Sequence, residues 1–364
     1  MTRRREKILL PLIAVLLGFV LGAVIVIATG RSPLAMFAAM IKGFSGLDII
    51  NDVPWNTRYV GEFVINAMPI ILTGLAFAFA SRTGLFSIGA EGQLMVGSLA
   101  ATAVALFVQA PKFVHLPLVL LASILAGALW GAVPGFLKAR FNVHEVTVSI
   151  MMNYIALHLN NFVILNIFGS QDRVKTAFFA ETALLKSPFL QSITRGSRLN
   201  WGFIPVIFAL IVFSFIINKT TFGYSLRAVG YNKDASRYAG MKVNRNIVLS
   251  MMIAGAFAGL AGSVITVGTF NFGRVISAAE GYGFDGIAVA LVGGSEASGI
   301  LFAGMLFGML KSAQPLMQSQ GIPREIAGII QASIVLFVAM QYGIKMLLER
   351  FKKKQAVTAD GDRV

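Results

Sequence analysis

The sequence contains no cysteine, only three histidines and few charged residues for its length. Without cysteine, the chain has no disulfides, no thiolate nucleophile and no thiolate metal ligand. Charged residues make up 13% of the 364 residues, whereas hydrophobic residues make up 56% and the mean hydropathy is +0.76. A water-soluble chain of this composition would expose a large apolar surface. The composition therefore indicates a membrane protein.

Several motifs that support catalysis are also missing. The sequence has no GxxxxGK(S/T) phosphate loop, no HExxH motif and no group of His, Asp and Glu with metal-ligand spacing. The chain is therefore not expected to hydrolyse nucleotide through a phosphate loop, and metal binding is unsupported. No nucleophile and base pair recurs either, so we predict no catalytic residue, no bound cofactor and no enzyme activity.

Long apolar runs without charge are the dominant positive feature. The runs at 8–29, 201–218 and 326–340 approach the ~20 residues that cross a bilayer as a helix. They are too long and too unalternating for barrel strands. We predict one polytopic all-α membrane domain, residues 1–364, with about ten helices. The predicted spans are 8–29, 62–81, 88–108, 115–137, 145–168, 201–218, 246–268, 283–296, 298–315 and 324–348.

The net charge of +15 is concentrated at the ends of the apolar runs. Basic residues gather at Arg3–Lys7, beside Lys138 and Arg140, within 219–245 and at 345–354. This distribution follows the positive-inside rule and predicts that both termini are cytoplasmic. It lacks the aromatic-interleaved basic surface of nucleic-acid readers, so nucleic acid is not an expected partner. The topology makes 30–61 and 169–200 exterior, 219–245 a cytoplasmic loop and 349–364 a basic, polar cytoplasmic tail.

Two parts of the chain carry matching patterns. Gly89-Ala90-Glu91-Gly92 resembles Gly283-Phe284-Asp285-Gly286. The third and eighth spans cross in opposite directions in the predicted topology, so we expect an inverted repeat of about five plus five helices, approximately 8–168 and 201–348. Such repeats are typical of transporters. The downstream correspondences are 127–131 with 304–308 and 143–146 with 323–326.

Glycines interrupt both of the spans that carry the matching motifs, so we predict that the third and eighth helices are broken. Glycine in a helix interior costs about 1 kcal/mol relative to alanine. Irregular backbone at membrane depth persists only where it is buried in protein or lines an aqueous cavity. Glu91 and Asp285 have two readings: they interact with a helix N-terminus, or they border or gate a substrate path.

The fifth span carries a polar face. Asn153, Asn160 and Asn161 recur at helical spacings of seven and eight in an otherwise apolar stretch. Their amides suit a hydroxyl-rich or base-bearing solute, and equally suit hydrogen bonding between helices. His158 lies in the same span and is expected to be a hydrogen-bonded packing residue. Weaker additions to the polar lining are Asn66, Gln93 and Gln331.

The 219–245 segment is, from physical argument alone, either a docking element or a solvated basic loop. Within it, Asp234–Tyr238 is predicted to form a short helix closed by Gly240. The segment resembles the cytoplasmic coupling segment of inner-membrane permeases in ABC importers of the branched-chain amino acid, ribose and nucleoside group. The matching positions are Gly223, Leu226, Arg227, Gly230, Asn232, Ala235 and Gly240, followed by Met241 and Val243.

Other motifs resemble the nucleoside subgroup of these permeases, and the resemblance covers about 56–348. Sugar permeases of the ribose type usually carry Gly-Ile-Asp-Leu-Ser-Val-Gly in place of the first motif. The motifs are Arg82-Thr83-Gly84-Leu85-Phe86-Ser87-Ile88-Gly89-Ala90-Glu91-Gly92-Gln93, His144-Glu145-Val146 with Met151-Met152-Asn153-Tyr154, and 283–291.

The resemblance implies one permease subunit of a bacterial cell-membrane importer that forms the path for nucleosides, with purine nucleosides such as guanosine favoured. Its partners would be a second, related permease, ATP-binding cassette ATPases that use ATP and Mg²⁺, and an extracytoplasmic solute-binding protein or lipoprotein. The exterior segments 30–61 and 169–200 are candidates for receiving that binding protein.

Two alternatives remain open at this stage. One is an ABC permease for a simple sugar such as ribose. The other is an ion-coupled secondary transporter, in which Glu91 and Asp285 would supply a cation site and no partner would be required. A channel or a purely structural membrane subunit is disfavoured, because inverted broken helices have little purpose in a scaffold.

Overall fold

The computed structural model describes residues 3–48, 54–169 and 173–340, with side chains from residue 11 onward. Apart from two isolated β-bridges, the regular structure of these residues is helical. Seven of their helices are long and apolar enough to cross a membrane, or eight if the bent pair α8 and α9 forms one span. The prediction of an all-α membrane protein is confirmed. The predicted number of ten spans is not.

Most predicted spans coincide with one helix. Two of them, 283–296 and 324–348, contain helices of only 11 and 15 residues within the described chain. The helices at the predicted spans are α1 (Arg3–Ala28), α3 (Arg58–Ser81), α4 (Ala90–Phe107), α5 (Lys112–Phe141), α6 (Glu145–Asn166), α8 (Phe203–Lys219), α11 (Val243–Ser263) with the π-helical η2 (Val264–Phe270), α12 (Tyr282–Val292), α13 (Ala297–Ser319) and α14 (Glu325–Ala339).

The segments between the predicted spans contain further helices. The exterior segment 30–61 includes α2 (Pro33–Ser45), which packs against α13 and buries Met36 and Met40. The segment 169–200 includes the 3-10 turn η1 (Glu181–Ala183) and α7 (Pro188–Ile193), and the segment 219–245 includes α9 (Thr221–Tyr231) and α10 (Lys233–Tyr238). The segment 219–245 therefore contains the short helix predicted over Asp234–Tyr238, whereas α2, η1, α7 and α9 are additional to the prediction.

Some predictions fall on parts of the chain that the structure does not describe. The end of the tenth predicted span, the basic cluster at 345–354 and the tail 349–364 lie outside the described residues. The helix α1 is described from Arg3, but the side chains of the first basic cluster are not.

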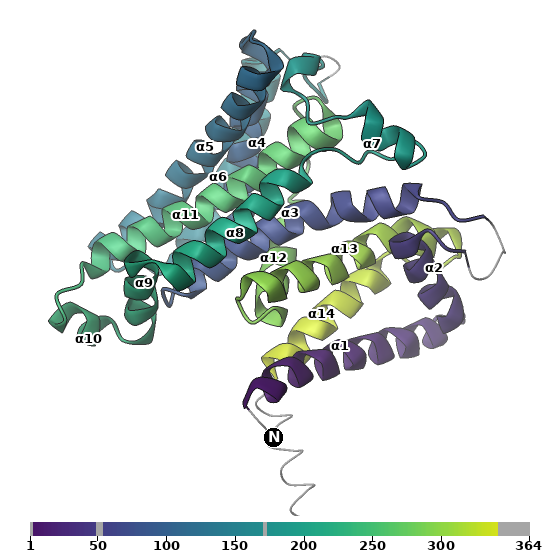
Figure 1. Cartoon of the computed structure of the whole chain (residues 1–364), viewed down its shortest axis with the longest axis horizontal. Helices are drawn as coiled ribbons and strands as arrows, with labels where there is room; N and C mark the ends of the chain where they lie inside the picture. Colours follow the sequence, from purple (N-terminus) through teal and green to yellow (C-terminus); the bar gives the residue numbers. More distant parts are fainter. Residues whose placement is uncertain (1–2, 49–53, 170–172, 341–364) are drawn as a thin grey trace, which may run out of the picture.

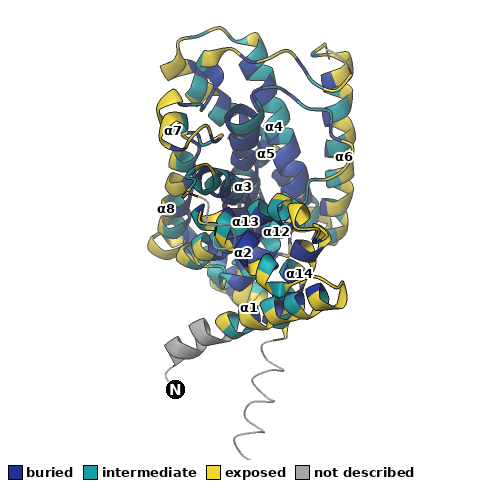
Figure 2. Cartoon of the chain, turned by 90° about the vertical axis from the view of Figure 1, so that its right-hand side faces the viewer, coloured by how far each residue is buried: buried dark blue, intermediate teal, exposed yellow. Residues whose placement is uncertain are grey.

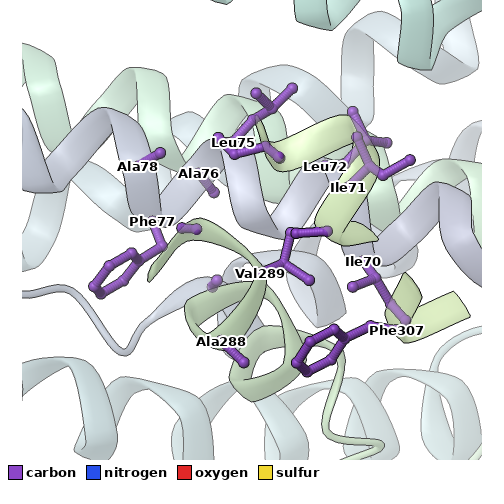
Figure 3. Close-up of a cluster of buried hydrophobic side chains, with 14 of the residues drawn as sticks. Ile70, Ile71, Leu72, Leu75, Ala76, Phe77, Ala78, Ala288, Val289 and Phe307 are labelled. Carbon is purple, nitrogen blue, oxygen red and sulfur yellow. The ribbon is translucent and has the colours of Figure 1, made fainter. Parts of the chain in front are cut away.

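The central helix of the molecule is α3, which is buried along most of its length. Figure 3 shows Ile71 and Leu75 of α3 in one apolar cluster with Val289 of α12 and Phe307 of α13. Inside a membrane, close packing of side chains rather than removal of apolar surface from water stabilises such contacts. The position of α3 therefore fixes where α12 and α13 lie.

The helices form two groups around α3 and α11 (Figure 1). In one group, α5 packs along α11, and α4 contacts these two helices. In the other group, α13 packs along α3, and α12 contacts these two helices. The motif glycines lie at the matching contacts: Gly127 of α5 faces Gly255 and Gly259 of α11, and Gly304 of α13 faces Ile71 of α3. A methyl group at Gly127 would overlap the Gly255 carbonyl oxygen. The corresponding glycine motifs therefore lie at helix contacts in both groups.

Large apolar side chains cover the outer faces of the peripheral helices. Figure 2 shows exposed residues along α6, α8 and α1, on the outside of the helix bundle. Leu125 of α5, Met151 of α6 and Phe208 of α8 are each more than 60% exposed. Isolated in water such faces would aggregate, so they are suited to lipid or to another membrane subunit.

Candidate functional site

Two non-helical segments lead into α4 and α12, and the starts of these two helices contact each other inside the bundle. Residues 82–89 connect α3 to α4, and residues 271–281 connect η2 to α12. The helix α12 has 11 residues, which at 1.5 Å per residue gives about 16 Å, roughly half of a ~30 Å hydrocarbon core. The eighth predicted span therefore contains only this short helix before the turn at 293–296. The third predicted span forms the continuous helix α4, so the prediction that it is broken is wrong; its glycines lie before the helix or in its first turns.

Glu91, at the start of α4, binds the start of α12. Its side chain is 1% exposed and accepts hydrogen bonds from the backbone N–H groups of Gly281 (3.0 Å) and Gly283 (2.5 Å). Thr73 of α3 adds a hydrogen bond from its hydroxyl to the Tyr282 carbonyl oxygen at 2.8 Å. A carboxylate at a helix N-terminus satisfies free N–H groups and interacts favourably with the helix dipole. Glu91 of α4, in the helix group around α11, therefore caps α12, which belongs to the helix group around α3.

Asp285, in the first turn of α12, forms an ion pair within the bundle. Its carboxylate lies 3.1 Å from the Lys311 ammonium of α13, and that ammonium lies 3.6 Å from the centre of the Tyr282 ring. Sequence analysis missed Lys311. The signal was a single lysine inside an apolar span, which is costly in a membrane and marks a functional position by default.

The asparagines of α6 face the two non-helical segments. Asn153 donates to the Ile88 carbonyl oxygen (3.0 Å) and accepts from the Gly92 N–H (2.9 Å), so it joins α6 to the start of α4. Asn160 donates to the Arg274 carbonyl oxygen, and Asn161 bonds both backbone groups of Ile276. The three amides share one face as predicted. Apart from a 3.2 Å hydrogen bond from Asn160 to the Asn161 side-chain oxygen, their partners are backbone groups of other elements. The three amides therefore hydrogen-bond α6 to neighbouring elements.

The other predicted polar residues lie in different surroundings. Gln93 is buried, with its amide nitrogen beside Gly131 of α5. Asn66 donates to the Glu62 carbonyl oxygen in its own helix, α3. The Gln331 amide nitrogen is buried without a hydrogen-bond partner among the described residues. His158 lies on the exposed face of α6 and makes no hydrogen bond to the described residues, so its predicted packing role is wrong.

A second ion pair lies within the segment that precedes α12. Arg274 contacts Glu280 through two hydrogen bonds of 2.6 and 2.9 Å, and its guanidinium lies 3.7 Å from the centre of the Phe270 ring. Both residues belong to the non-helical segment before α12. No three His, Asp or Glu side chains among the described residues come together as a metal site.

The predicted coupling segment forms two short helices after a sharp bend. The axes of α8 and α9 differ by 72°. The Thr220 hydroxyl caps α9 at Gly223, and the Asn232 side chain caps α10 by accepting from the Asp234 and Ala235 N–H groups. The predicted short helix is confirmed as α10, and Gly240 follows it with a left-handed φ of 79°.

The two helices present one buried and one exposed face. Leu226 and Val229 are buried, whereas Tyr231 and Tyr238 are 92% and 95% exposed. Gly223 packs against the end of α8, and Gly230 packs against the turn that follows α3. The remaining predicted positions, Arg227, Asn232 and Ala235, are half-buried or exposed.

The segment between α6 and α8 is folded against the rest of the molecule at the opposite end from α9 and α10 (Figure 1). It forms isolated β-bridges from Lys175 to Arg274 and from Lys186 to Asn200. Arg198 contacts Glu62 of α3 through hydrogen bonds of 2.6 to 3.3 Å. This end of the chain therefore has an ordered surface.

Comparison with known proteins agrees with this architecture. The profile of the family described as branched-chain amino acid transport system / permease component matches residues 59–339. The chain is 48% identical over 357 residues to the guanosine ABC transporter permease protein NupP of Bacillus subtilis, covering 98% of this chain and 100% of the relative. It is 39% identical over 329 residues to the nucleoside permease NupB of Lactococcus lactis, covering 89% and 88%. A second B. subtilis guanosine permease, NupQ, is 29% identical over 254 residues, covering 68% and 79%.

Proposed function

The chain belongs to the family of branched-chain amino acid transport system permease components, and on this basis we propose that it is the permease subunit of an ATP-binding cassette importer for nucleosides. Purine nucleosides such as guanosine are the favoured substrates. The observation that carries the proposal is the end-to-end similarity to a guanosine permease, which spans 98% of this chain. Two B. subtilis relatives with the same named substrate support pairing with a second, related permease.

The energy for transport comes from separate ATPase subunits that use ATP and Mg²⁺, because the sequence contains no phosphate loop. Their docking site is formed by α9 and α10. The exposed tyrosines Tyr224, Tyr231 and Tyr238 offer large, semi-polar contacts there, and Arg227 and Arg237 add positive charge. Aromatic and arginine side chains are enriched at protein interfaces.

The orientation in the bacterial cell membrane follows from this docking. The end with α9 and α10 faces the cytoplasm, as do both termini. The opposite end, with 30–61 and 169–200, receives an extracytoplasmic solute-binding protein. The approximate repeats 8–168 and 201–348 then have opposite orientations.

The substrate path follows the two non-helical segments between α3 and α4 and between η2 and α12. Irregular backbone of this kind persists at membrane depth where it lines a cavity or is buried in protein. The residues proposed to border the path are Asn66, Glu91, Gln93, Asn153, Asn160, Asn161 and Asp285. For several of them the amide or carboxylate bonds also hold the path in shape.

The test is purification of the tagged chain from native membranes, followed by identification of the co-purifying proteins and measurement of ATPase activity. We expect an ATPase, a second permease and stimulation of hydrolysis by guanosine with the binding protein present, and no stimulation by ribose. Stimulation by ribose alone would indicate a sugar permease. A chain that purifies alone and moves guanosine under an ion gradient would contradict the proposal in favour of a secondary transporter.

A further inference from the structure

The turn Arg82–Gly84, at the end of α3, touches the coupling helix α9. A methyl group placed on Gly230 of α9 would overlap the Arg82 carbonyl oxygen and lie 3.0 Å from the Gly84 nitrogen. Gly84 has a left-handed φ of 73°, which a glycine adopts without strain. The two backbones are therefore in direct contact, with no side chain between them that could absorb a displacement.

The same turn is hydrogen-bonded to the end of α12. The Arg82 guanidinium donates from Nε (3.2 Å) and Nη2 (2.7 Å) to the Ser295 carbonyl oxygen. The Ser81 hydroxyl lies 3.3 Å from the Ser295 hydroxyl. Gly294 and Ser295 both have left-handed φ values, of 62° and 54°, so this is a tight turn with a defined geometry. A forked, charged donor on one carbonyl oxygen fixes that turn in direction as well as in distance.

The opposite end of α12 is held by the same part of the chain. Glu91 accepts from Gly281 and Gly283, and Thr73 donates to the Tyr282 carbonyl oxygen, as described above. Residues 73–91 therefore contact α12 at both of its ends. A displacement of the Arg82–Gly84 turn cannot leave α12 in place without breaking these hydrogen bonds.

A third contact of the turn leads to α11. The Thr83 hydroxyl donates to the Ser250 hydroxyl at 2.8 Å, and both residues are fully buried. Three elements distant in sequence thus meet at one turn of three residues: α9, α11 and the α12–α13 connection. Buried hydrogen-bonded networks of this kind hold their members in a single arrangement.

We propose that the Arg82–Gly84 turn is the relay that carries motion of α9 to α12, and that Arg82 is the positioning residue that makes the two helices move together. This inference rests on the proposed function, in which α9 receives the ATPase. When ATP binding displaces α9, Gly230 pushes the turn, and Arg82 carries Ser295 with it. The connection between the ATPase contact and the broken helix is therefore made by one arginine side chain and one glycine contact.

The relay is tested first by distances in the intact transporter, with the partner permease, ATPase and binding protein present. The chain has no cysteine, so spin labels attach only where cysteine is introduced. Suitable exposed positions that the proposed ATPase contact does not use are Thr221 at the start of α9, Glu296 after α12 and Leu16 on α1 as a reference. We expect ATP to change the 296–16 distance and to leave the 221–296 distance unchanged. An unchanged 296–16 distance, or a changed 221–296 distance, would overturn the relay.

Substitutions then test Arg82 itself. In Arg82→Gln we expect about a tenfold fall in guanosine transported per ATP hydrolysed, the order of a typical coupling between sites, and a broadened 221–296 distance. Arg82→Lys keeps a charged donor and should restore part of the coupling. Ser81→Ala removes the hydroxyl but leaves the Ser295 carbonyl bound, and Arg140→Gln removes an exposed arginine at the end of α5. Both should behave as wild type.

The outcomes separate the relay from the function on which it rests. A wild-type complex whose hydrolysis does not respond to guanosine would contradict the proposed function. A responsive wild type in which Arg82→Gln assembles normally and keeps its transport per ATP would contradict the relay alone. Equal loss of coupling in Arg82→Gln and Arg140→Gln would also contradict it, since general loss of positive charge would then suffice.

Discussion

Replacing Glu91 with glutamine tests whether the first helix group holds α12 through its N-terminus. The Glu91 carboxylate is buried and accepts two backbone N–H groups, from Gly281 and Gly283. A glutamine side chain offers one oxygen and one NH₂ group. It therefore satisfies one of the two N–H groups and directs a donor toward the other, and it removes the charge that interacts with the helix dipole.

Glu91→Gln loses two contributions to stability: one hydrogen bond to a carboxylate, whose value lies between the first two figures below, and the interaction with the helix dipole. Hydrogen bonds between membrane helices average about 0.6 kcal/mol, hydrogen bonds to charged groups contribute about 1.5–3 kcal/mol, and the dipole interaction adds about 0.3–1 kcal/mol. We expect Glu91→Gln to lower the free energy of unfolding by about 2 kcal/mol. Glu91→Asp keeps the charge but is one methylene shorter, so its effect should be smaller.

The assay is heat-induced loss of helical circular dichroism of the purified chain in detergent. The matched control is Glu181→Gln, the same substitution at an exposed glutamate in η1. We expect a clear fall in the unfolding midpoint for Glu91→Gln and none for Glu181→Gln. Equal midpoints for the two variants would refute the reasoning, because the carboxylate would then contribute nothing that an amide does not.

Three further predictions follow from the other contacts of the site. Lys311→Met or Asp285→Asn alone should lower the free energy of unfolding by about 2–4 kcal/mol, because each leaves a charge without its partner. The double variant should be more stable than the sum of the two single losses predicts, which a double-mutant cycle of thermal midpoints measures. Asn153→Ala should raise the guanosine concentration for half-maximal uptake without loss of assembly, and unchanged uptake kinetics would remove it from the path. Arg227→Glu, or deletion of Asp234–Tyr238, should uncouple ATP hydrolysis from uptake, and normal values of both would contradict the docking assignment.

The long helices could be predicted because their apolar runs alone determine them. The helices α3, α5 and α6 each begin and end within about four residues of the predicted span. The short helix α2 was missed, since 13 residues with Lys42 inside them do not resemble a membrane span. It forms because its apolar side chains pack against α13, a contact that local sequence does not reveal.

Several residues of the candidate site could be named from the sequence, but Lys311 and the contacts among the residues could not. The matching glycine motifs identified Glu91 and Asp285, and helical spacing placed Asn153, Asn160 and Asn161 on one face. The partners lie far away in the sequence: Glu91 bonds Gly281, 190 residues on. Such contacts depend on how the two helix groups pack together, which composition and spacing leave undetermined.

The relay turn shows the same limit. Arg82-Thr83-Gly84 stood in the sequence as part of a motif that resembles the nucleoside subgroup, without a stated role. Its role came from the contacts of Gly230 and Ser295, both more than 140 residues away along the chain. The motif in the sequence identifies these residues, and only the packing of the helices shows what they contact.

The most direct measurement of the central claim is uptake of labelled guanosine into proteoliposomes that contain the chain with its partner permease, ATPase and binding protein. The account predicts accumulation that requires ATP and Mg²⁺ on the ATPase side, that unlabelled guanosine suppresses and that ribose does not. Accumulation by the chain alone, driven by an ion gradient without ATP, would contradict it.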